Sequence, residues 1–136
     1  MKTLVVDDVK VNCRVLQGLL SGYGECDIAN DGASAVRLFN QALTGDAPYD
    51  LVCLDIMMPD YDGRQVLQAL RRLEEQNDVG EDRQCRIFMV SSRDEDQIKI
   101  ECDKLGCDAY LEKPVKVAEL RAKLLATGLI LVDRAI

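Results

Sequence analysis

Five short apolar segments alternate along the chain with longer segments of helical periodicity, and this alternation restricts the possible folds more than any other feature. The apolar segments have the length of buried strands and occupy residues 2–6, 25–29, 50–54, 87–90 and 109–111. The segments after them repeat apolar residues every three or four positions, over about residues 9–21, 31–44, 64–76, 94–105 and 115–126. The pattern predicts an α/β fold with a doubly wound, five-stranded parallel sheet in the order 2-1-3-4-5.

The helical segments also carry start signals. Asn30 or Asp31 can cap the second helix, and Asp94 with Gln97 has the spacing of a capping box for the fourth. The first and last helices repeat apolar residues at helical spacing, at Val11, Val15, Leu16, Leu19, Leu20, Val117, Leu120 and Leu124.

The charge of the chain excludes several functions. Its 136 residues include 17 basic and 24 acidic side chains, which gives a net charge of −7. This balance argues against binding to nucleic acid or to an anionic membrane, and no apolar window approaches the roughly 20 residues of a membrane span. Because the N-terminus leads straight into the first strand, we expect no signal peptide and a cytoplasmic protein.

Cysteine and histidine usage narrows the chemistry further. The six cysteines form no CxxC pair, so we expect free thiols that pack as small apolar residues in a reducing cytoplasm. A redox role for Cys102 and Cys107 is the alternative. The absence of histidine excludes Ser-His-Asp triads, Cys-His dyads and His-ligated metal sites.

Charged residues stand where three of the predicted strands end. Asp7 and Asp8 follow the first strand, Asp55 the third and Lys113 the fifth. In an open parallel sheet, ligands bind beyond the carboxyl ends of the strands, at the switch point between strands one and three. Clustered acids repel one another, so their convergence predicts a site for a hard cation such as Mg²⁺ and for a phosphate.

Each of these residues also has a purely structural explanation. An aspartate after a strand is often a turn former or a helix cap, and Lys113 alone would be an ordinary surface charge. Ser91, at the end of the fourth strand, is either a cap or a hydroxyl donor to the phosphate. Their convergence on one sheet edge favours the functional interpretation.

At these residues the sequence resembles the receiver domain of bacterial two-component response regulators, a flavodoxin-like fold. The resemblance covers about residues 2–126 and rests on the order and spacing of Val5-Val6-Asp7-Asp8, Leu54-Asp55-Ile56-Met57-Met58-Pro59, Asp62-Gly63, Val90-Ser91-Ser92 and Tyr110-Leu111-Glu112-Lys113-Pro114. It implies that Asp55 accepts a phosphoryl group from a phosphohistidine on a sensor histidine kinase or phosphotransfer protein. It also implies Mg²⁺ as the cofactor, with Mn²⁺ as a substitute.

The resemblance assigns a role to each matching position. Asp8, Asp55 and the main-chain carbonyl of Met57 would bind the metal directly, and Asp7 would bind it through water. Lys113 would bridge to the phosphoryl oxygens across a cis peptide bond to Pro114.

The same resemblance describes how the signal leaves the site. Ser91 would follow the phosphoryl group, and Tyr110 would turn inward when Ser91 moves. This would change the face formed by helix four, strand five and helix five, which a downstream protein reads. Met57 and Arg93, each two residues past a key position, would tune access of the attacking water, although Arg93 could instead be a solvated charge.

We therefore expect a signalling domain over residues 1–126 that catalyses only its own phosphoryl transfer and slow autodephosphorylation. Alternatives are the excised receiver of a longer transcription regulator or hybrid kinase, and a Mg²⁺-dependent phosphatase with an aspartyl nucleophile. Met57 counts against the phosphatase, which typically has a second acid at that position. The apolar tail at 127–136 is expected either to pack on the domain after Gly128 or to mediate a homodimer.

Overall fold

The predicted sheet is present in full. The computed structural model describes residues 1–45, 47–59, 61–93 and 95–131. Five parallel strands lie in the order β2-β1-β3-β4-β5, which confirms the predicted topology. The strands are β1 (Thr3–Val6), β2 (Cys26–Ala29), β3 (Leu51–Asp55), β4 (Arg86–Ser91) and β5 (Ala109–Glu112).

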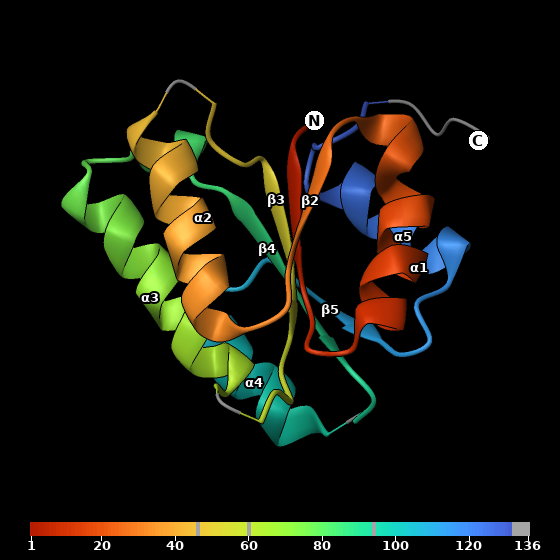
Figure 1. Cartoon of the computed structure of the whole chain (residues 1–136). Coiled ribbons are helices and arrows are strands. Elements are labelled where there is room, and N and C mark those ends of the chain that lie inside the picture. The colour runs from red at the N-terminus through yellow and green to blue at the C-terminus, as the bar shows by residue number, and fades with distance from the viewer. Residues whose placement is uncertain (46, 60, 94, 132–136) are drawn as a thin grey trace.

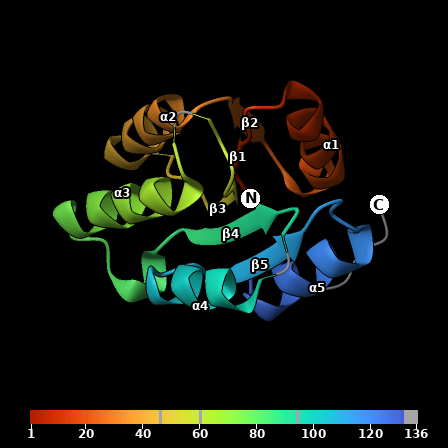
Figure 2. The same cartoon turned by 90° about the horizontal axis from the view of Figure 1, so that it is seen from below.

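Five α-helices cover both faces of this sheet, as predicted. They are α1 (Lys10–Leu20), α2 (Gly32–Thr44), α3 (Gly63–Gln76), α4 (Asp96–Lys104) and α5 (Val117–Ala126), with short 3-10 helices at Ser21–Tyr23 and Glu81–Arg83. Helices α1 and α5 lie on one face, and α2, α3 and α4 lie on the other (Figures 1 and 2). Within the described residues, no helix is both long and apolar enough to cross a membrane.

The sheet separates two apolar cores because successive side chains of a strand point to opposite faces. Leu4 and Val6 of β1 belong to the core under α2, α3 and α4, whereas Val5 belongs to the core under α1 and α5. Strands β1 and β3 are buried throughout, which explains why they read as unbroken apolar runs.

Strand register brings the charged residues to one edge of the sheet. Strands β1 and β3 pair to the end of β1, so Asp7, directly after β1, lies beside Asp55, the last residue of β3. Strands β4 and β5 also pair to their ends, so Lys113 follows next to Ser91. The site is therefore assembled by backbone hydrogen bonding between strands.

One of the predicted helix caps is confirmed, and another falls on a residue outside the described part of the chain. Asp31 caps α2, and its carboxylate accepts a hydrogen bond from the backbone N–H of Ser34 at 2.7 Å. The proposed capping box at the start of α4 depends on Asp94, which lies outside the described residues. The helix starts after Glu95, which makes no side-chain cap.

Three apolar residues that fall at helical spacing are exposed. Val11 and Val15 of α1 are 63% and 56% exposed, and Val117 of α5 is 49% exposed. The buried stripe of α1 runs through Leu16 and Leu20, as predicted, and through Cys13 in place of Val11 and Val15. Spacing alone does not distinguish two adjacent stripes of a helix when both are apolar.

The beginning of the C-terminal tail packs on the domain. Gly128 has a φ of 75°, the left-handed conformation that commonly ends a helix, and the N–H of Leu129 donates to the carbonyl of Leu124. Leu129 and Ile130 pack against the core under α1 and α5, but Leu131 is 91% exposed. The remaining tail residues, 132–136, lie outside the described part of the chain.

A buried ionic network at the opposite end of the sheet was not predicted. The guanidinium of Arg71 donates to Glu74, to Asp108 and to the carbonyls of Cys85 and Gly106, at 2.7–3.0 Å. Glu74 is only 1% exposed, and its second oxygen accepts from the N–H of Cys85 at 2.7 Å. The network fastens α3 to the start of β4 and to the turn between α4 and β5.

Removing Glu74 should destabilise the fold strongly. Glu74→Ala leaves the Arg71 charge without its buried partner and the N–H of Cys85 without its acceptor, which costs about 3 kcal/mol in the free energy of unfolding. Urea denaturation measures this loss. The matched control is Glu75→Ala, because Glu75 is exposed on the same helix, and its cost should stay below about 0.5 kcal/mol. Equal costs for the two variants would contradict the role given to the network.

Candidate functional site

Two acids, Asp7 and Asp8, follow β1 and differ in burial. Asp7 is 1% exposed; its Oδ1 accepts from the N–H of Val9 at 2.9 Å. The side chain of Asn30 donates to the Asp7 carbonyl at 3.0 Å and so holds the end of β1 against the end of β2. Asp8 is half-buried. Both carboxylates are therefore placed by the short connection between β1 and α1.

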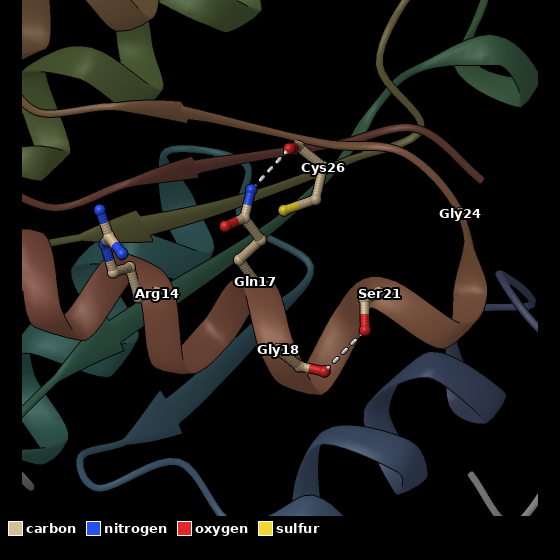
Figure 3. Close-up of a pocket in the computed structure, with 6 residues that line it drawn as sticks. All are labelled: Arg14, Gln17, Gly18, Ser21, Gly24 and Cys26. Atoms are coloured by element: carbon tan, nitrogen blue, oxygen red, sulfur yellow. Dashed lines mark hydrogen bonds between the residues drawn. The ribbon is translucent and has the colours of Figure 1, made fainter.

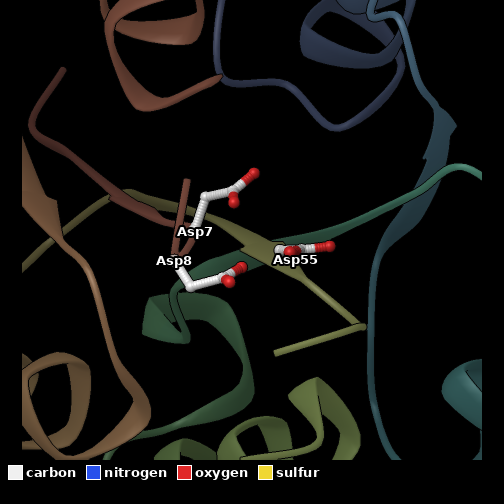
Figure 4. A group of neighbouring side chains, drawn as sticks. All are labelled: Asp7, Asp8 and Asp55. Carbon is white, nitrogen blue, oxygen red and sulfur yellow. The ribbon is translucent and has the colours of Figure 1, made fainter. Parts of the chain in front are cut away.

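Asp55 completes a cluster of three carboxylates. It is 4% exposed, and its Oδ1 accepts from the N–H of Met57 at 3.3 Å. One carboxylate oxygen from each of Asp7, Asp8 and Asp55 lies within 4.8 Å of the other two (Figure 4). Oxygen atoms at this spacing are the ligands that a hard divalent cation prefers.

Lys113 contacts two of the three acids. Its Nζ lies 3.0 Å from Oδ2 of Asp7 and 3.2 Å from Oδ1 of Asp55. Burial lowers the pKa of Lys113, but the hydrogen bonds and charges of Asp7 and Asp55 more than offset this, so the pKa is raised. One ammonium cannot neutralise three carboxylates, and the site keeps an excess of negative charge when all three are ionised.

Burial lowers the pKa of a lysine but raises that of a carboxylic acid such as Asp55. It raises the pKa of Asp55 to about 6, and the charge of Asp7 adds to the rise, whereas Lys113 opposes it. The carboxylate is thus held in an environment that penalises its charged form. A cation or a neutralising covalent partner would relieve that penalty.

Ser91 and Tyr110 are connected through the main chain of Arg93. Ser91 is 1% exposed, and its Oγ accepts from the N–H of Arg93 at 3.1 Å. The hydroxyl of Tyr110 donates to the carbonyl of Arg93 at 2.6 Å. Nζ of Lys99 lies 5.4 Å from the centre of the Tyr110 ring. A chain of contacts therefore runs from the sheet edge to α4.

The remaining predicted site residues lie at the edge of the site. Met57 is 50% exposed, and the side chain of Arg93 pairs with Glu95 at 3.5 Å. The peptide bond between Lys113 and Pro114 is cis.

Asn30 and Gly63 were named from the sequence, but the supporting contacts that they make were not predicted. Asn30 was considered only as a helix cap, yet its side chain holds the carbonyl of Asp7. At Gly63, a Cβ would collide with the carbonyl of Asp55 and lie 2.7 Å from Cα of Ile56. An Asp-Gly pair shortly after a catalytic candidate is the sequence signal that could have indicated this close approach.

The cysteines take no part in the acidic cluster as reactive groups. All six are free thiols in this structure. Burial raises the pKa of Cys13 to about 11 and that of Cys107 to about 12, so both remain protonated at neutral pH. A protonated thiol is a poor nucleophile, and this favours the packing role over the redox alternative.

A separate hollow of about 460 Å³ lies between α1 and the start of β2 (Figure 3). Its hydrogen bonds are local: Gln17 donates to the carbonyl of Cys26, and the hydroxyl of Ser21 donates to that of Gly18. Among the residues that the structure describes, those lining the hollow include no acid, so it does not share the chemistry of the carboxylate cluster.

A doubly wound sheet with three acids and a lysine at its switch point has the groups that a cation and a phosphate would require. The family model of the response regulator receiver domain matches residues 3–125. The chain belongs to this family.

Relatives place the same domain in larger proteins. Hybrid signal transduction histidine kinase L of Dictyostelium discoideum is 37% identical over 88% of the chain, which is 7% of that protein. The transcriptional regulatory protein CusR of Escherichia coli K12 is 33% identical over 90% of the chain. The chain spans about half the length of CusR, at 49%.

Solved structures agree with the fold. The receiver domain of the histidine kinase CKI1 from Arabidopsis thaliana, complexed with Mg²⁺ and BeF₃⁻, is 27% identical, with a TM-score of 0.77 over 90% of this chain and 88% of that one. A two-component response regulator from Clostridium difficile is 26% identical, with a TM-score of 0.77 over 96% and 98% of the two chains. The predicted receiver fold is thereby confirmed.

Neutralising Asp55 should stabilise the metal-free protein. The raised pKa means that the folded state holds a proton that the unfolded state releases, so stability falls between about pH 4 and pH 6 and then levels off. Asp55→Asn removes this penalty, and its gain should grow over the same range to about 2 kcal/mol. Urea denaturation in EDTA at pH 4 and pH 7 measures the difference. A gain that is absent at pH 7, or equal at both pH values, would contradict it.

Proposed function

We propose that this receiver domain accepts a phosphoryl group on Asp55 from the phosphohistidine of a sensor histidine kinase or phosphotransfer protein. The observation that carries the proposal is the buried Asp55 carboxylate at 3.2 Å from Lys113 inside a cluster of three acids. A structural aspartate gains nothing from this placement, because burial raises its pKa and its neighbour repels it. Asp55 is the carboxylate of the three that touches both Lys113 and the connection to α3.

The donor set fits Mg²⁺, with Mn²⁺ as a substitute. Asp8, Asp55 and the main-chain carbonyl of Met57 would bind the ion directly. Both oxygens of Asp7 are already engaged, Oδ1 by the N–H of Val9 and Oδ2 by Lys113, which supports binding through water. When bound, the ion would neutralise the carboxylates and the charge on the phosphoryl oxygens.

The chain's own residues account for the transfer. Asp55 attacks phosphorus as the carboxylate while the P–N bond of the phosphohistidine breaks, and the imidazole leaves with the bonding electrons. Lys113 already lies beside the Asp55 carboxylate, so it would meet the incoming phosphoryl oxygens without a large movement. Later attack of water on the acyl phosphate returns Asp55 to its starting state. Met57 and Arg93 stand at the mouth, where their side chains would tune this hydrolysis.

The response would pass from Ser91 to Tyr110. A phosphoryl group on Asp55 offers new acceptors to the Ser91 hydroxyl, whose oxygen accepts from the N–H of Arg93 in the present state. Movement of Ser91 would disturb that contact, and the Arg93 carbonyl holds Tyr110. We propose that the face of α4, β5 and α5 changes in this way for a downstream protein.

The wider context belongs to the same proposal. The chain would act either alone or as the receiver of a longer transcription regulator or hybrid kinase. The net charge of −7 supports a protein as the partner rather than nucleic acid or a membrane. The six free thiols support a location in the reducing cytoplasm.

A homodimer would use the exposed apolar tail residue Leu131, and sedimentation of the chain cut after Ile130 would test it.

Acetyl phosphate tests the central reaction. Incubation with this donor and Mg²⁺ should add one labile phosphoryl group, seen by intact-mass measurement, and EDTA should prevent it. Asp55→Asn should remain unmodified, whereas the control Asp103→Asn, at an exposed acid of α4, should react as wild type does. The proposal is wrong if wild type stays unmodified and also fails to bind beryllofluoride.

Replacing Lys113 should strengthen Mg²⁺ binding but slow phosphoryl transfer. Lys113→Gln removes the cation that competes with the metal for the three acids, so Mg²⁺ should bind several-fold more tightly. The same variant lacks the charge that meets the phosphoryl oxygens, so phosphorylation should slow on the order of a hundredfold. A Mg²⁺ titration and the rate of mass change measure the two effects. Weaker Mg²⁺ binding, or an unchanged rate, would contradict this role.

A further inference from the structure

The connection between β3 and α3 forms a closed loop beside the acidic cluster. The N–H of Gly63 donates to the carbonyl of Ile56 at 2.8 Å, and Met57 and Asp62 form an antiparallel bridge. Asp62 then caps α3 with a capping box. The loop ends are thus fixed to each other, and the N–H of Met57 ties the loop to Asp55 at 3.3 Å. None of these bonds joins the loop to the acids that follow β1, so its orientation toward them needs a further contact.

A contact between Tyr61 and Gly32 supplies that orientation. Gly32 is the first residue of α2 and is buried. A Cβ at Gly32 would lie 2.7 Å from both Cβ and Cδ2 of Tyr61 and still closer to Cγ, so the ring occupies the space that any side chain at position 32 would need. Tyr61 remains 38% exposed despite this packing.

The same junction between β2 and α2 also contacts the connection after β1, which carries Asp7 and Asp8. Two residues before Gly32, the side chain of Asn30 donates to the carbonyl of Asp7 at 3.0 Å. The segment from Asn30 to Gly32 therefore contacts the acidic connection after β1 and the loop that contains Met57. It fixes the spacing between these two sets of proposed metal ligands.

We propose that the ring of Tyr61, seated on Gly32, positions the main chain of Met57 and so sets the affinity of the site for a divalent cation. Tyr61 is a positioning residue in this role: it acts through the loop and does not touch the cation. The inference rests on the proposed metal site at Asp7, Asp8 and Asp55.

Mg²⁺ titrations followed by amide chemical shifts in NMR test the proposal. Gly32→Ala and Tyr61→Ala should each raise the dissociation constant for Mg²⁺ by about tenfold. Tyr61→Phe keeps the ring and should remain within about twofold of wild type. The matched glycine control is Gly18→Ala, at an exposed position of α1 where a Cβ meets nothing within 4 Å, and it should bind Mg²⁺ as wild type does.

Phosphorylation by acetyl phosphate supplies a second readout. In Gly32→Ala, the Mg²⁺ concentration for the half-maximal rate should rise, whereas the rate at saturating Mg²⁺ should stay near that of wild type. A general loss of structure would lower both. If Gly32→Ala does not fold, the comparison of Tyr61→Ala with Tyr61→Phe decides the question.

Failure of this inference is distinguishable from failure of the proposed function. Unchanged Mg²⁺ affinity in Tyr61→Ala, together with normal binding and phosphorylation of wild type, overturns the positioning role alone. Absence of Mg²⁺ binding and of phosphorylation in wild type overturns both.

Discussion

The site depends on the contact of one ammonium with two carboxylates at the carboxyl edge of the sheet. Lys113 lies within 3.2 Å of both Asp7 and Asp55, yet the cluster stays deficient in positive charge. Every strand that reaches this edge is pinned by its neighbours, so the charges cannot move apart to relieve their repulsion. The sheet therefore maintains an unfavourable arrangement of negative charge that a bound cation would relieve.

The sequence was sufficient for the fold because its signals agreed with one another. Buried parallel strands produce unbroken apolar runs, and their alternation with helical periodicity leaves few topologies. Because the carboxyl ends of parallel strands meet at one edge, the predicted topology also places Asp7, Asp55, Ser91 and Lys113 together. Backbone hydrogen bonds impose the strand register, and this register places Lys113 3.0 Å from Asp7, although the two residues are 106 positions apart in the sequence.

Other features depend on tertiary contacts that local patterns do not encode. Val11 and Val15 have the spacing of a buried stripe, but the helix turns its neighbouring stripe inward. The bonds of Arg71 join segments far apart in sequence, so a single buried arginine has no local signature. The contact of Gly32 with Tyr61 is of the same kind: each residue alone looks like part of an ordinary turn or helix start.

The hydrogen bonds around Arg93 have a consequence for how such a domain can diversify. Ser91 and Tyr110 reach residue 93 through its amide and its carbonyl, whereas its side chain turns to Glu95. Nearly any amino acid other than proline supplies the same two main-chain groups. In the function proposed here, the side chain at position 93 could therefore be exchanged, and the rate of hydrolysis with it, while Ser91 and Tyr110 keep their contacts with the main chain of that residue.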